Sequence, residues 1–342
     1  MEIYNNKTHP IIKNDDTYFL DKKVVTFHSE DRDIKKWPNS NEFEVSLPES
    51  FQNIQSMRLL SMNLNDDLPV FSNKYRNTKL SFALGAYDEN TKSNIHTIII
   101  HEGTYTPVIL ASTIQSLMNA KVGGVNFICK YDMITKKMYF SCDVQFHLRF
   151  DLYHEYNDVC YNEYIFQNNT SNWGLPYMLG YDRKVYDSVL STDLFCFLSL
   201  TRDSSIRNDN IQPNKYFVEF TDTNPVNIKG ETCFYMELDK YNVIDEILPD
   251  SNKRKTLSVN NGKVNAVFAQ IPLNKSFYEQ IFECKNNYNP PIKNISKLKF
   301  KFRFHDGKLV DFKNINFSFM IEFNTLTNEQ RRNTFIRSSN IL

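Results

Sequence analysis

The sequence predicts an all-β protein, a jelly-roll-like antiparallel β-sandwich or pair of sandwiches with one helix inserted near residues 106–121. Apolar and polar residues alternate through many short segments, which is the period of a strand with one buried and one solvent-facing side. The chain has 27 Phe and 19 Tyr. Large rings at alternating positions build the core of a sheet. Only one segment of substantial length changes to the helical period.

The stretch at residues 24–64 supplies the clearest strands. Apolar residues alternate with polar ones from 42 to 47, and we expect Pro48 to end this strand because proline has no N–H to donate to a ladder. Residues 54–64 form a more continuously apolar run, which is typical of a strand deeper in a sandwich. A charged turn precedes both strands.

The predicted helix begins with Thr106 as its N-cap and Pro107 in the first helical position. Gly123 and Gly124 end it. Apolar residues at helical spacing share one face: Leu110, Ile114, Leu117 and Met118.

The remaining segments with β periodicity extend to the end of the chain. Residues 138–150 are long for one strand, so we expect a bend near Asp143. Asn261 and Gly262 are typical of a two-residue hairpin turn. The other expected strands are residues 80–84, 95–100, 189–200, 216–220, 233–238, 256–260, 264–271, 298–304 and 315–323.

Four regions follow from these patterns. Residues 1–22 are polar and are expected to form an extended N-terminal arm. Residues 23–205 form a first β-sandwich region that contains the helix and an aromatic insertion at 153–186. Residues 206–325 form a second β-sandwich region, which either interleaves with the first or folds as a domain of its own. Residues 326–342 form a C-terminal tail.

The composition argues against several classes of protein. The chain has 40 basic and 40 acidic residues among its 342, a balance that argues against a dedicated nucleic-acid or membrane-surface binder. A globule of this size does not need disulfides or metals to hold it together. The six cysteines are spread out without a C-x-x-C pair, so we expect reduced thiols and no zinc site. No signal peptide or membrane-length apolar segment is recognised.

The charged turn contains Asp31, Arg32 and Asp33. We interpret it as a structural turn in which Arg32 binds carboxylates and backbone and thereby orients the flanking strands. The alternative is a carboxylate site for acid–base chemistry or a cation. For a glycosidase, Glu30, Asp31 and Glu102 are the first carboxylates to test.

Two further groups are candidate contacts with a partner. Trp173, Tyr177 and Tyr181 lie in the aromatic insertion, which either contacts another protein or stacks against sugars. Lys299, Lys301 and Arg303 lie on one face of an alternating strand, which faces solvent or a protein partner, or alternatively touches nucleic acid. No motif for nucleophilic, metal or nucleotide chemistry is found. We therefore expect no catalytic residue, cofactor or small-molecule substrate.

Three groups of motifs, taken in order, resemble minor capsid and related virion proteins of large nucleocytoplasmic DNA viruses, the giant-virus type. The first is S-E-D-R-D at 29–33 with W-P-N at 37–39 and F-E-V-S-L-P at 43–48. The second is E-G-T-Y-T at 102–106 leading into the helix. The third is F-R-F-H-D-G at 302–307 followed by V-D-F and the last strand.

The resemblance implies a structural virion protein. It implies a minor capsid component, without catalysis, that cements the capsomers of the major capsid protein in an icosahedral shell assembled in the host cytoplasm. Its partners are then the major capsid protein and other minor capsid proteins, with no specific nucleic acid and no direct membrane span. The alternatives are a penton or vertex capsid protein, and a glycan-binding β-sandwich module.

Overall fold

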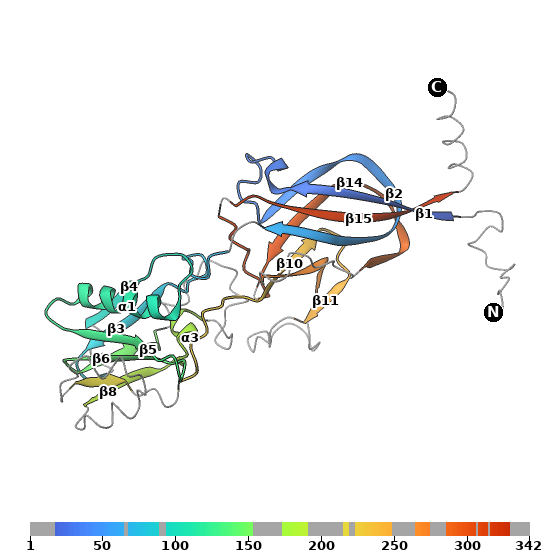
Figure 1. Ribbon diagram of the computed structural model, residues 1–342. Helices are drawn as coiled ribbons and strands as arrows, with labels where there is room; N and C mark the ends of the chain where they lie inside the picture. Colours follow the sequence, from blue (N-terminus) through green and yellow to red (C-terminus); the bar gives the residue numbers. More distant parts are fainter. Residues whose placement is uncertain are drawn as a thin grey trace, which may run out of the picture. The chain divides into compact units, whose positions relative to one another are not determined.

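The computed structural model confirms a mostly β protein built from curled antiparallel sheets with one main helix (Figure 1). It describes residues 18–64, 68–88, 94–152, 173–190, 215–218, 223–247, 264–273, 285–305, 307–313 and 315–328. Several expectations lie outside these ranges: most of the N-terminal arm, residues 153–172 of the aromatic insertion, the strands at 191–200 and 256–260, the hairpin turn at Asn261 and Gly262, and nearly all of the tail.

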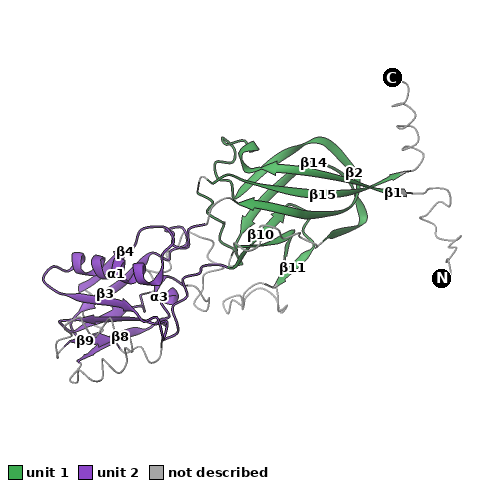
Figure 2. Cartoon of the chain, in the orientation of Figure 1, with its two compact units in different colours: residues 1–67, 232–248, 260–342 green, residues 68–231, 249–259 purple. Residues whose placement is uncertain are grey.

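The chain divides into two compact units (Figure 2). Unit 1 comprises residues 1–67, 232–248 and 260–342, and unit 2 comprises residues 68–231 and 249–259. Unit 2 is therefore inserted between strands of unit 1. This division differs from the expected boundary near residue 205, because strands from both ends of the chain pair with each other in unit 1.

Unit 1 is a six-stranded antiparallel sheet with the strand order β1-β15-β2-β14-β10-β13. A two-stranded sheet of β11 and β12 accompanies it. The strands are β1 (Tyr18–His28), β2 (Glu42–Leu64), β10 (Cys233–Leu238), β11 (Ile244–Ile247), β12 (Val264–Val267), β13 (Ala269–Pro272), β14 (Asn286–Arg303) and β15 (Phe317–Asn328).

Strand β2 joins the two strands that we expected on either side of Pro48, so the prediction that Pro48 ends a strand is wrong. The β2–β14 register shifts between the pairs Phe51–Ile295 and Ser46–Lys297, and Pro48 lies within this irregularity. An irregular position does not need every ladder hydrogen bond, so a residue without an N–H is tolerated there.

Phenylalanine rings fill the core of unit 1. The rings of Phe27 and Phe319 stack with their centroids 5.3 Å apart, and Phe300 meets Phe319 edge to face at 4.9 Å. Phe302 packs edge to face on Phe317 at 5.2 Å. These rings come from β1, β14 and β15, so the core joins residues from opposite ends of the chain.

Unit 2 is a seven-stranded antiparallel sheet with the order β4-β3-β7-β8-β9-β6-β5. Its strands are β3 (Lys79–Leu84), β4 (Ile95–Ile99), β5 (Phe127–Tyr131), β6 (Met138–Cys142), β7 (Phe146–Arg149), β8 (Val185–Leu190) and β9 (Tyr216–Val218). The bend expected near Asp143 is a break between β6 and β7, which occupy separate positions in the sheet.

The main helix, α1 (Pro107–Lys121), lies where the sequence predicts it. The Thr106 hydroxyl accepts a hydrogen bond from the backbone N–H of Ile109 at 3.3 Å, which caps the helix. The buried face of α1 packs into the core of unit 2, and α1 contacts both β4 and β5. Because these are the two edge strands, one helix covers both edges of the curled sheet.

Two short helices complete the described structure. They are the 3-10 helix η1 (Ser29–Asp31) and the single turn α3 (Leu175–Met178). Within the described residues, no helix is long and apolar enough to cross a membrane.

Candidate functional site

The charged turn after β1 is organised by Arg32. Its guanidinium donates to the backbone carbonyls of Ser29, of Trp37 at 3.0 Å and of Pro38 at 3.3 Å. These acceptors are carbonyls and not the carboxylates that we expected Arg32 to bind as well. The Asp33 carboxylate accepts from the backbone N–H of Lys35 at 3.0 Å. Both side chains fix the path of the backbone, as a structural turn requires.

The same turn forms hydrogen bonds with residues near the other end of the chain. The buried Ser29 hydroxyl accepts from the backbone N–H of Phe317 at 3.0 Å, at the start of β15. The Asn41 side-chain amide donates to the carbonyl of Val310 at 3.0 Å, and the backbone N–H of Phe302 donates to the carbonyl of Asn41 at 2.8 Å. The motifs at 29–48 and at 302–317 thus form one continuous structural block.

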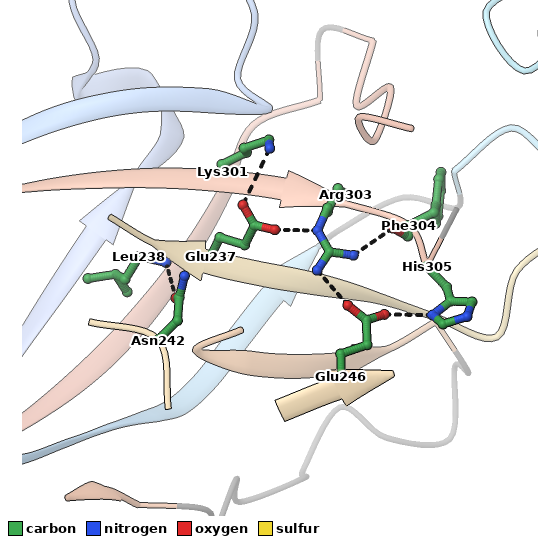
Figure 3. Close-up of polar contacts among 8 residues, drawn as sticks. All are labelled: Glu237, Leu238, Asn242, Glu246, Lys301, Arg303, Phe304 and His305. Carbon is green, nitrogen blue, oxygen red and sulfur yellow. Dashed lines mark hydrogen bonds and ion pairs between the residues drawn. The ribbon is translucent and has the colours of Figure 1, made fainter. Parts of the chain in front are cut away.

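A buried ionic cluster lies near the end of β14 (Figure 3). Arg303, with a side chain only 2% exposed, donates to Glu237 of β10 and to Glu246 of β11 at 2.5 Å. The other Glu246 oxygen lies 2.6 Å from Nδ1 of His305. Lys301 makes a second ion pair with Glu237 at 3.4 Å. Arg303 thereby links the six-stranded sheet to the β11–β12 pair.

The electrostatics favour the charged states of Glu237 and Arg303. Burial raises the pKa of Glu237, but hydrogen bonds from Arg303 and the charges of Lys301 and Arg303 outweigh that effect, so its pKa lies below the usual value. Arg303 is fully engaged, because it also donates to the carbonyl of Phe304 at 3.0 Å. The cluster therefore holds strands together.

A second ionic cluster surrounds Glu322 on β15. Its carboxylate, on a side chain 2% exposed, lies 2.6 Å from Lys22 Nζ of β1 and 2.9 Å from Arg58 Nη2 of β2. Asn324 donates to its other oxygen at 2.9 Å. Burial raises the pKa of Glu322, but these three donors more than compensate and lower it to about 2. The cluster joins three neighbouring strands.

The basic face of β14 differs from the expectation of an open contact surface. Arg303 is buried, so we correct its assignment as a partner contact. Lys299 pairs with Glu42 at 2.6 Å and stands over the ring of Trp37, 5.0 Å from its centroid. The side chains of Lys299 and Lys301 are 36% and 40% exposed. Acidic residues on neighbouring strands offset this basic face, which disfavours nucleic-acid binding.

The three aromatic candidates lie in different environments. Tyr181 is 1% exposed, belongs to the core of unit 2 and donates its hydroxyl to the carbonyl of Met138 at 2.7 Å. It is therefore not available to a partner, and its assignment is corrected. Trp173 is half-buried, packs against the same core and lies under Arg183, 5.5 Å from the ring centroid. Tyr177 alone of the three is exposed, at 37%.

The carboxylates considered for catalysis belong to both units, and Glu30 and Glu102 make hydrogen bonds within their own units. Glu30 lies in unit 1, where it accepts from the Asn316 side chain at 3.3 Å. Glu102 lies in unit 2, where it accepts from the backbone N–H of Asn73 at 2.8 Å. Asp31 is exposed beside Glu30. No group of three potential metal ligands occurs among the residues that the structure describes.

Sequence reasoning missed the buried acids Glu246 and Glu322 and the partly buried Glu237. Glu237 and Glu322 alternate with buried apolar residues, so the period-two pattern assigns them to the solvent-facing side. Glu246 lies in β11, a strand that the sequence did not predict. One signal was available, because the alternating Lys and Arg residues of β14 require acidic partners on adjacent strands. The pattern does not say which strands are adjacent.

Two solved structures are similar to this chain at low sequence identity. No protein-family model matches the chain. No curated protein matches it. The mavirus penton protein is similar over 90% of this chain and 99% of its own length, with 9% identity and a TM-score of 0.38. A chain of the Sputnik virophage structure is similar over 92% of this chain and 98% of its own length, with 9% identity and a TM-score of 0.33.

Proposed function

We propose that this chain is a structural virion protein, a minor capsid component that cements capsomers of the major capsid protein. The observation that supports it most is the interlocking of the motifs at 29–48 and 302–317. These segments resemble virion proteins of large DNA viruses, and Asn41 and Val310 meet although they are 269 residues apart. The two motifs are far apart in the sequence but contact each other in the fold. Their shared resemblance to virion proteins therefore supports the proposal more strongly than either motif alone.

The polar groups of the described structure fit this role. Arg32, Arg303 and Glu322 each bind several backbone or side-chain partners and stabilise the sheets. A protein that acts by presenting rigid surfaces needs such internal bonds and no reactive group. We therefore propose that the chain is not an enzyme and that it needs no cofactor.

We propose that the chain contacts the capsid through those candidate partner-contact residues that are accessible to solvent. Lys299 and Lys301 offer a partly exposed, ion-paired strand face in unit 1, and Tyr177 with the half-buried Trp173 offers an aromatic position in unit 2. Partly exposed ion pairs at the rim of an interface set orientation more than affinity. The major capsid protein and other minor capsid proteins are the proposed partners, in particles assembled in the host cytoplasm.

A penton or vertex protein is the alternative, because the same sheet architecture serves different positions in a lattice. The position of the chain in the particle distinguishes the two roles. A penton protein groups around the fivefold axes, whereas a cement protein lies between capsomers along the faces. The glycan-binding reading loses support, because the buried Tyr181 cannot contribute to an exposed stacking platform.

The experiment is co-sedimentation of the purified chain with assembled major capsid protein from the same source. Binding that saturates at a fixed ratio supports the proposal. A Lys299→Glu, Lys301→Glu variant should bind more weakly. Lys121→Glu, Lys229→Glu is the control with the same change of charge, at two exposed lysines of unit 2. An absence of binding to assembled or partly assembled capsid protein would overturn the proposed role.

A further inference from the structure

The six-stranded sheet of unit 1 has two unlike edges. One edge, β13, is short and ends at Pro272, and both features limit pairing with a further strand. The other edge, β1, is an 11-residue strand. In the described part of the chain β1 forms a ladder only with β15. Its outer edge is the type of surface to which another strand adds.

The side chains of β1 near this edge have an unusual arrangement. Leu20 and Val24 are 54% and 47% exposed and lie on the same face of the strand, the face from which Lys22 reaches Glu322. Asp21 and Lys23 lie on the opposite face. Lys23 pairs with Glu49 at 2.6 Å, and both groups are well exposed to solvent. Asp21 is exposed and has no ion-pair partner among the described residues.

We propose that β1 pairs antiparallel with β1 of a second copy of this chain, about a twofold axis through Lys22. In this register Leu20 faces Val24 of the second copy, and Asp21 faces its Lys23. Each contact occurs twice. Two exposed apolar pairs and two opposite-charge pairs are thereby formed, and such cross-strand pairs stabilise a sheet. Residues directly opposite each other lie on the same face, as this pairing requires.

The neighbouring symmetric registers are disfavoured by charge. Moving the axis to Asp21 places two aspartates opposite each other. Moving it to Lys23 places two lysines opposite each other and replaces both Asp21–Lys23 pairs with pairs between Asp21 and Val25. Like charges in opposite positions are destabilising. At Lys22 the axis also brings two lysines together, but each is already paired with Glu322 at 2.6 Å. Of these three registers, only the one about Lys22 forms opposite-charge pairs across the axis.

The contact is one strand wide, so the dimer is expected to be weak and to depend on protein concentration. A shell that concentrates the chain would favour it, but the inference does not depend on the proposed capsid role. It rests on the exposure, charge and pairing of β1 alone.

Sedimentation velocity of the full chain over a concentration series tests the proposal. The wild-type sedimentation coefficient should rise with concentration. Asp21→Lys should lower the association constant by roughly tenfold or more, because it replaces two attractive pairs with two repulsive ones. Asp245→Lys is the matched control, because Asp245 is also an exposed acid on a strand of unit 1.

A mixture of two variants provides the decisive result. Asp21→Lys and Lys23→Glu should each remain largely monomeric alone and should associate when mixed, because both pairs across the axis are then opposite in charge. Circular dichroism of each variant verifies that it is folded. If the loss of the Glu49 pair unfolds Lys23→Glu, Leu20→Lys alone is the second test, because it removes both apolar pairs and should also lower the association constant. Monomeric wild-type protein, or association that Asp21→Lys leaves unchanged, overturns the proposal.

Discussion

The edge strands of the two sheets are covered differently in the two units. In unit 2 the curled sheet brings both edge strands, β4 and β5, against the single helix α1, whose apolar face completes the core. In the described part of unit 1 no comparable helix covers the sheet. Its strands share a core of phenylalanine rings and are joined in addition by buried ionic clusters. Unit 2 is thus closed by apolar packing, whereas unit 1 keeps a long edge strand, β1.

Because of this difference, we expect different changes to destabilise the two units. A core built from apolar contacts responds to loss of volume and is largely indifferent to pH and salt. A sheet joined through Arg303 and Glu322 responds to any change that leaves one buried charge without its partner. The chain has two tryptophans, Trp37 in unit 1 and Trp173 in unit 2. Replacing either one by Phe leaves a fluorescence probe for the other unit.

The largest effect is expected from Arg303→Met. It removes the guanidinium from the buried Glu246 and the partly buried Glu237, which should destabilise unit 1 by about 3–5 kcal/mol. Urea unfolding followed through Trp37 measures it. Lys301→Met on the same strand is the control, because its ion pair is 40% exposed on the lysine side and should contribute less than ~1 kcal/mol. Equal effects of the two variants would contradict the assigned role of Arg303.

The corresponding change in unit 2 is Ile114→Ala. Ile114 is 0% exposed on the buried face of α1, and its truncation should cost about 2–5 kcal/mol through lost burial and a cavity. Unfolding followed through Trp173 measures it. Ile109→Ala, on the same helix but 54% exposed, should change the stability by less than ~1 kcal/mol. If Trp37 reports the Ile114→Ala loss as strongly as Trp173, the two units do not unfold separately.

Arg32→Ala removes the side-chain hydrogen bonds that organise the charged turn after β1. It should lower the stability of unit 1 by less than the two core changes do. The guanidinium donates to three backbone carbonyls, and charged hydrogen bonds of this kind contribute roughly 1–3 kcal/mol to stability in total. The melting temperature of unit 1 should fall, and that of Lys35→Ala, an exposed neighbour, should not. An unchanged melting temperature for Arg32→Ala would count against the structural reading of the turn.

Acid should affect unit 1 more than unit 2. The pKa of Glu322 is lowered from 4.5 to about 2 in the folded chain, so its contribution is present above pH 4.5 and is lost as the pH falls toward 2. The lowered pKa of Glu237 acts in the same direction. After allowance for solvent around the exposed Lys22, the Glu322 loss should be on the order of 1–2 kcal/mol.

Denaturation curves between pH 6 and pH 2.5, read through Trp37 and through Trp173, measure this difference. Glu322→Gln should flatten the pH dependence that Trp37 reports. A pH dependence of unit 1 that persists unchanged in this variant would mean that Glu322 is not its source.

The elements that the sequence predicts well are those set by local contacts. Thr106 and Pro107 begin α1 as expected, because capping and the fixed φ of proline act within one turn. Most strands of unit 1 also follow their period-two patterns. Local patterns do not specify which distant strands pair, so the insertion of unit 2 into unit 1 did not follow from them.

The candidate site shows the same limit. We expected Arg303 at the surface because it lies on the basic face of an alternating strand, and Tyr181 because it lies in the aromatic insertion. Their burial depends on Glu237 and Glu246 for Arg303, and on the core of unit 2 for Tyr181. The continuation of β2 through Pro48 likewise depends on a register irregularity with β14, more than 200 residues away in the chain.

The most direct test of the proposed function is cross-linking mass spectrometry of purified virus particles from the source of this sequence. The account predicts that the chain is present in a fixed ratio to the major capsid protein and that cross-links join the two, with lysines of β14 among the linked residues. Particles that lack the chain, or that contain it without any cross-link to a capsid protein, would contradict a structural role in the shell.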